Sequence, residues 1–73
     1  MPKLYSAEKT IKAFQRAGFV IVSQKGSHIK LRGLRNGKLQ TIIVPNHKEI
    51  ARGTFTSILE QAGMTSQEFD AFL

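Results

Sequence analysis

The dipeptide Asn36-Gly37 is the feature that most restricts how this chain can fold. A type I′ turn needs positive φ at both central residues, and Asn-Gly is the strongest short signal for such a hairpin turn. A two-residue turn at this point aligns Leu31 with Ile42 on the two flanking strands. The same register aligns Ile29 with Val44. We expect these four side chains to point toward one covered face of a sheet.

Three segments predict the strands of that sheet, through aromatic and β-branched residues or through the alternation of apolar and basic ones. They are residues 19–23, the alternating segment 29–33 and residues 39–44. Lys25-Gly26 predicts a tight turn between the first two strands. Pro45 ends the third strand because it has no N–H for the ladder. The sequence therefore predicts an antiparallel meander of three short strands.

Residues 7–17 predict a first helix, since their apolar side chains recur at helical spacing. Ser6 is suited to cap its start, and Gly18 suits the left-handed position just past its end. Its basic residues recur at spacings of three and four, which aligns them into a stripe. They are Lys9, Lys12 and Arg16.

A second helix is predicted over residues 55–62, with Thr54 as its cap and Gly63 at its end. The segment Thr65-Ser66-Gln67-Glu68 has the pattern of a capping box, which predicts a short terminal helix over 66–72. The element order is α-β-β-β-α-α.

This order predicts an α+β domain whose antiparallel sheet carries the helices on one face and leaves the other face open. The hairpin register places Lys30 and Arg32 on the open face, opposite Ile43 and Thr41. His28 points the same way, because it precedes Lys30 by two residues. An imidazole and two cations would then share one uncovered surface.

Length, charge and cysteine content restrict the class of protein. The 73 residues make one domain, 1–73, and the absence of cysteine excludes disulfides and thiolate metal sites. The net charge is +6, and residues 1–52 hold all eleven basic residues but only two of the five acidic ones. Such a concentration favours a polyanionic partner, although a merely solvated surface is the alternative.

Without a signal peptide or an apolar run of about 18 residues, we expect a cytoplasmic protein with no membrane segment.

The residues able to carry chemistry are few. The chain has two histidines, one aspartate and four glutamates, which are poorly suited to form a zinc site. The sequence supports neither a Ser-His-Asp triad nor a nucleotide-binding motif. Cleavage of RNA needs no cofactor, because the ribose 2′-OH is a built-in nucleophile and imidazole titrates near neutral pH. His28 is the candidate catalytic residue, with His47 secondary. The candidate RNA-binding residues are Lys25, Gly26, Ser27, Lys30 and Arg32.

Four ordered segments together resemble the HicA (YcfA-like) mRNA interferase family, toxins of type II toxin–antitoxin systems. They are Gly18-Phe19, Lys25-Gly26-Ser27-His28, Val44-Pro45-Asn46-His47 and the segment 53–63. The resemblance implies a fold like the double-stranded RNA-binding domain, metal-independent cleavage of mRNA by His28, and a cognate antitoxin of the HicB type. Many members have a second histidine or polar residue after Gly-Ser-His, where this chain has Ile29.

Two other classes of protein fit the same residues. One is a non-catalytic RNA-binding module that recognises duplexes by shape. The other is an interaction domain whose basic surface binds an acidic protein. His28 distinguishes them from a nuclease, since a binding module does not need an imidazole at that position.

Overall fold

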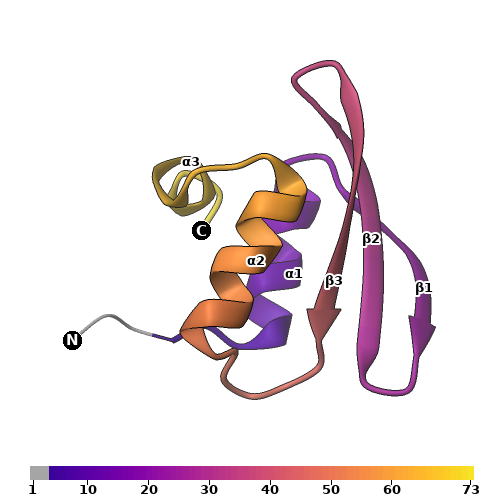
Figure 1. Ribbon diagram of the computed structural model, residues 1–73, viewed down its shortest axis with the longest axis vertical. Helices are drawn as coiled ribbons and strands as arrows, with labels where there is room; N and C mark the ends of the chain where they lie inside the picture. The colour runs from indigo at the N-terminus through magenta and orange to yellow at the C-terminus, as the bar shows by residue number, and fades with distance from the viewer. Residues whose placement is uncertain (1–3) are drawn as a thin grey trace.

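The computed structural model describes residues 4–73 as an open three-stranded sheet with all three helices on one side (Figure 1). The strands are antiparallel in the order β1-β2-β3, which confirms the predicted α+β layout. The elements, in chain order, are α1 (Ala7–Arg16), β1 (Val20–Lys25), β2 (His28–Arg35), β3 (Lys38–Pro45), α2 (Arg52–Ala62) and α3 (Ser66–Asp70).

The β2–β3 hairpin has the predicted turn and register. Asn36 and Gly37 adopt positive φ values of 54° and 76°, as a type I′ turn requires. Ile29 pairs with Val44, and Leu31 pairs with Ile42. All four of these apolar side chains are buried beneath the helices. The hairpin therefore separates a covered face from an open one.

The core lies between the sheet and the helices and is strongly aromatic. Phe14 and Phe19 pack edge to face, with ring centroids 5.3 Å apart. Phe69 of α3 contacts both Phe14 and Tyr5, at centroid distances of 5.4 and 5.5 Å. The terminal helix thus completes the core of the domain, as expected for a small chain that has little apolar surface to spare.

The element boundaries differ from the predictions in two regions. Phe19 does not belong to β1, because its side chain turns into the core and is only 1% exposed. The strand instead continues to Lys25, so the tight turn is centred on Gly26-Ser27. Thr54 is not the cap of α2, which begins at Arg52 after Ala51 and has no side-chain cap.

The remaining helices agree more closely. Ser6 caps α1 through the Lys9 N–H as predicted, and the helix ends at Arg16 with Ala17 as its C-cap. The capping box before α3 is present, although that helix ends at Asp70 rather than at residue 72.

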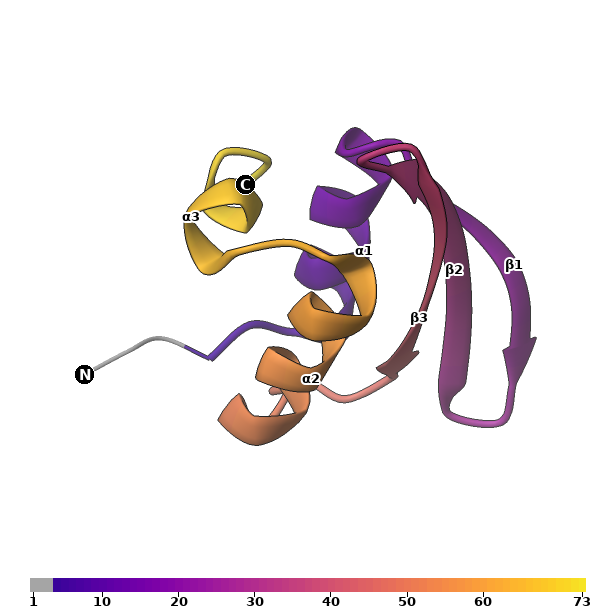
Figure 2. The ribbon, with the colours of Figure 1, turned by 45° about the horizontal axis from the view of Figure 1, so that its top comes forward.

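β1 is an edge strand that the helices do not cover (Figure 2). All six of its residues are exposed, and its pairing with β2 shifts between Ile21 and Ser23. This irregularity is a bulge at Val22, a feature that bends an edge strand and increases its twist. The predicted strand exists, but it contributes little to the core.

α3 is tied to the far end of β2 through Glu68. Its carboxylate accepts the Thr65 backbone N–H at 2.8 Å and pairs with the Arg35 guanidinium at 2.7 Å. The hydrogen bond from the Thr65 N–H is the main cause that lowers the pKa of Glu68 below its usual value. Arg35 lowers this pKa further, whereas partial desolvation of the carboxylate raises it. The end of β2 next to the hairpin turn is therefore anchored to α3.

Gly33 on β2 is expected to tolerate no side chain. A Cβ at this position would lie 2.8 Å from Cγ and 2.9 Å from Cα of Phe19. Because the Phe19 backbone cannot move freely, Gly33→Ala should lower the free energy of unfolding by about 1–3 kcal/mol. Urea unfolding measures this. The matched control is Gly53→Ala, since its Cβ meets nothing within 4 Å and alanine favours a helix. Equal stability of the two variants would contradict the packing argument.

Glu68→Gln should reduce stability in a pH-dependent way. A carboxylate whose pKa is lowered by folding stabilises the protein above its unfolded pKa, and the effect is lost as pH falls through the folded pKa. The melting temperature of the variant should therefore lie below that of the wild type at pH 7, and the difference should shrink at pH 3. Circular dichroism measures both, with Glu60→Gln on α2 as control. A difference that does not change with pH would show that the charge is irrelevant.

Candidate nucleic-acid interface on the sheet

His28 begins the central strand of the sheet, immediately after the β1–β2 turn. It pairs with Lys25 across β1 and with Pro45 across β3, and its side chain is exposed. Gly26 in the turn has a positive φ of 59°, which a side chain would strain, and nothing lies within 4 Å of its Cβ position. The predicted tetrapeptide thus presents an accessible imidazole beside an ammonium group and an open stretch of backbone.

Lys30 and Arg32 continue from His28 along the open face of β2. Lys30 is half-buried and pairs with Ile43, while Arg32 is exposed and pairs with Thr41. The Arg32 Nε donates to the Thr41 hydroxyl at 3.2 Å, which orients the guanidinium across the two strands. Alternate residues of a strand share one face, so the histidine and the two cations form a single row. We call His28, Lys30 and Arg32 the basic row.

Asn46 makes a contact in this region that the sequence did not predict. Its backbone N–H donates to the Ser27 carbonyl at 2.6 Å, which ties the end of β3 to the β1–β2 turn. The Ala7 N–H in turn donates to the His47 carbonyl at 2.9 Å. Two backbone contacts therefore hold the turn, the β3–α2 loop and the start of α1 together. The signals for it in the sequence were the place of Asn46 directly after the strand-ending proline and within the segment Val44-Pro45-Asn46-His47.

His47 lies at the same end of the molecule as His28 but in a different setting. It is exposed, and it lines a hollow of about 190 Å³ beside the start of α1, with Lys48 as the neighbouring cation. His28 does not line this hollow. The structure therefore does not bring the two imidazoles into one cavity.

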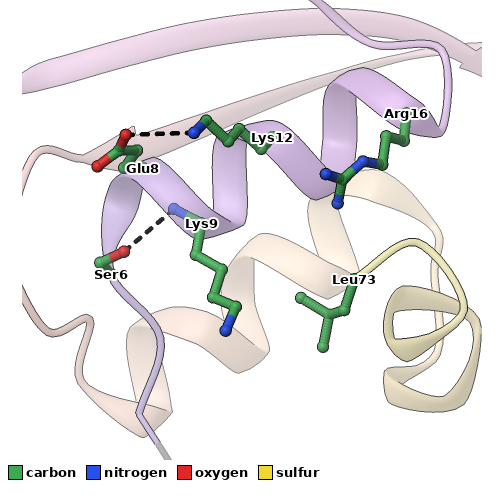
Figure 3. A pocket seen from close by; sticks show the side chains of 6 residues that line it. All are labelled: Ser6, Glu8, Lys9, Lys12, Arg16 and Leu73. Carbon is green, nitrogen blue, oxygen red and sulfur yellow. Dashed lines mark hydrogen bonds and ion pairs between the residues drawn. The ribbon is translucent and has the colours of Figure 1, made fainter.

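The stripe of cations on α1 lines a separate groove of about 410 Å³ (Figure 3). His28 is not among the residues that line this groove. One of its cations is paired with a carboxylate, and another is hydrogen-bonded to a backbone carbonyl. Lys12 pairs with Glu8 at 3.3 Å, and Arg16 donates to the Phe72 carbonyl at 3.0 Å. The basic row on the sheet carries no such carboxylate partner among the ion pairs of residues 4–73.

Metal and membrane sites are not indicated by residues 4–73. This part of the chain contains no cluster of three or more histidine, aspartate or glutamate residues suited to hold a metal ion. Nor does any helix there combine the length and the apolar character needed to cross a bilayer.

The structure is a small α+β domain whose antiparallel sheet is covered by helices on one face and presents an exposed histidine and cations on the other. Residues 7–64 match the family model described as "HicA toxin of bacterial toxin-antitoxin". The chain therefore belongs to the HicA family of toxins, and this membership implies a cognate antitoxin as its partner. No curated protein matches the chain. α3 lies outside the matched residues.

Proposed function

We propose that this chain is the toxin of a type II toxin–antitoxin system and acts as a metal-independent endoribonuclease. The observation that carries the proposal is the exposed His28 at the head of the basic row, in a chain of the HicA family. Its substrate would be mRNA, and its place of action the cytoplasm, where mRNA is translated. The cognate antitoxin would be of the HicB type.

The proposed reaction uses the ribose of the substrate as nucleophile. The 2′-OH loses its proton and attacks the adjacent phosphorus, while the P–O5′ bond breaks and the departing 5′ oxygen gains a proton. The products are a 2′,3′-cyclic phosphate and a free 5′-OH. His28 acts as the proton-transfer group, because imidazole both accepts and donates protons near neutral pH. This chemistry needs positive charge near the phosphate but no further reactant.

The neighbours of His28 are suited to hold the phosphate. Lys25 is its cross-strand partner, and Lys30 follows on the same face about 7 Å along the strand. Gly26 and Ser27 form the turn, where the backbone can approach a ligand closely and the Ser27 hydroxyl can donate a hydrogen bond. Arg32 extends the cationic row along the RNA chain.

His47 has a secondary role in this proposal. It lies at the same end of the domain, but it lines a hollow next to α1 rather than the face that carries the basic row. We assign it to binding of the flanking RNA, together with Lys48, rather than to proton transfer at the scissile phosphate.

A non-catalytic RNA-binding module is the second candidate. It is favoured by the charge of the sheet, since residues 20–45 contain five basic residues, of which Arg35 is paired with Glu68, and no acidic one. Such a surface binds a polyanion whether or not chemistry follows. The two candidates differ in their dependence on the imidazole of His28.

Induction of the chain in a bacterial host should arrest growth and fragment mRNA, and His28→Ala should abolish both effects. Loss of a general acid–base group typically lowers a rate about 10²–10⁴-fold. Because His28 is exposed, the variant should keep the wild-type circular dichroism spectrum and melting temperature. His47→Ala is the matched control and should retain most of the cleavage.

Arrest of growth by His28→Ala at wild-type strength would contradict the proposed mechanism. Binding of RNA by the wild type without cleavage would favour the second candidate. Purified protein in excess chelator should cleave RNA at an unchanged rate, and a loss of cleavage there would contradict metal independence.

Lys30→Ala and Arg32→Ala should each weaken RNA binding and reduce its salt dependence. A lost phosphate contact lowers the slope of log affinity against log salt by about one unit. Titration of a single-stranded RNA at several salt concentrations measures the slope. Lys12→Ala is the control, because its ammonium is already paired with Glu8 at 3.3 Å. A slope that changes for Lys12→Ala alone would move the RNA path from the sheet to α1.

A further inference from the structure

Two hollows of the molecule meet at the start of α1. Ser6 and Glu8 line both the hollow beside His47 and Lys48 and the larger groove along α1. From there the larger groove follows the stripe of cations on α1 and is also lined by Leu73 (Figure 3). One continuous depression therefore runs from the β3–α2 loop along the first helix. We call it the α1 track, and its histidine and cations are His47, Lys48, Lys9, Lys12 and Arg16.

The α1 track begins beside the turn that precedes His28. The Asn46 N–H donates to the carbonyl of Ser27, the residue before His28, at 2.6 Å. The next residue along the loop, His47, accepts the Ala7 N–H at 2.9 Å through its own carbonyl. Figure 1 shows the β1–β2 turn, the end of β3 and the start of α1 at one end of the molecule. A ligand that leaves His28 past Asn46 therefore enters the track directly.

The cations of α1 are available to an anion to different degrees. Lys9 is exposed and forms no ion pair within residues 4–73. Arg16 donates to the Phe72 carbonyl, but that acceptor is neutral and a guanidinium has five N–H groups, so its charge is kept. Lys12, by contrast, is paired with Glu8 at 3.3 Å, and Figure 3 shows its ammonium directed back to that carboxylate. The track therefore presents two cations of α1 and withholds the third.

A polyanion fits the α1 track better than a protein surface does. Among the residues of 4–73 that line the two hollows, Leu73 is the only large apolar one and Glu8 the only acidic one. A protein partner needs apolar area to bury, whereas phosphates need charge and polar groups. The route runs from the open face of the sheet to the helices behind it, which a flexible single strand can follow and a stiff duplex cannot over so short a distance.

We infer that the α1 track is a second binding site for RNA, which holds the single-stranded backbone on one side of the phosphate at His28. The inference rests on the proposed function in that His28 marks the scissile phosphate, and it extends the role given to His47 and Lys48 onto α1. Contacts to phosphates carry no sequence preference, so the track adds affinity for longer RNA rather than for particular bases. Glu8 limits this affinity, because it keeps Lys12 from a phosphate.

The test measures RNA binding in the His28→Ala variant, in which no cleavage intervenes. The probes are oligouridylates of about 4 and about 16 nucleotides, the range of lengths that small single-strand binding domains occupy. Lys30→Ala should weaken the binding of both probes, because both occupy the basic row. Lys9→Ala should weaken only the longer probe, about three-fold, and lower its slope of log affinity against log salt by about one unit. Fluorescence anisotropy at several salt concentrations measures both quantities.

Glu8→Gln should strengthen the binding of the longer probe about three-fold and raise its salt slope by about one unit, because Lys12 becomes available to a phosphate. Lys12→Ala should cancel this gain when it is added to Glu8→Gln, although it has little effect alone. The control is Lys38→Ala, which removes one positive charge next to the hairpin turn and outside both hollows. It should leave the ratio of the two affinities unchanged. Glu8, Lys12 and Lys38 are exposed, so these variants should keep the circular dichroism spectrum of their parent.

An equal loss of affinity for both probes in Lys9→Ala would show a general effect of charge and would overturn the inference. So would unchanged binding of the longer probe in Lys9→Ala, unchanged or weaker binding in Glu8→Gln, or tighter binding of a duplex than of a single strand of the same length. Failure of the wild type to cleave RNA, with the length dependence intact, would reject the proposed nuclease alone. Loss of the length dependence with cleavage intact would reject the α1 track alone.

Discussion

The pairing of β2 with β3 is the interaction on which the rest of the molecule depends. Each residue of a strand faces opposite to the next, so the register of one hairpin decides the face of every side chain on both strands. Here the Asn36-Gly37 turn fixes that register, and Leu31 and Ile42 meet beneath the helices as a result. A slip of one residue would bury Lys30 and expose Leu31. The buried core and the basic open face are thus two consequences of a single turn.

The site depends on the same pairing at the other end of the sheet. β2 starts at His28, where Lys25 and Pro45 are its partners, and the Asn46 N–H closes the gap to the β1–β2 turn at 2.6 Å. An imidazole at the first residue of a central strand is exposed, yet its backbone is held from both sides. Positions of this kind suit chemistry, because the group is accessible while its support is rigid.

Features of the structure that depend on neighbouring residues were predictable from the sequence, and features that depend on distant contacts were not. The hairpin register, the cap of α1 and the capping box before α3 depend on residues adjacent in the chain, and all were predictable. The start of β1 was not, because Phe19 leaves the strand to pack on Gly33, which is distant in sequence. The start of α2 was also misplaced, since Ala51 offers no capping side chain as a signal. The contact of Asn46 with Ser27 is a backbone contact and leaves no side-chain pattern.

Charge is distributed unevenly between the sheet and the rest of the chain. All five acidic residues lie outside the strands, and the strands and their turns hold five of the eleven basic ones. The sheet and its turns therefore hold most of the net positive charge, which favours the proposed binding of a polyanion there.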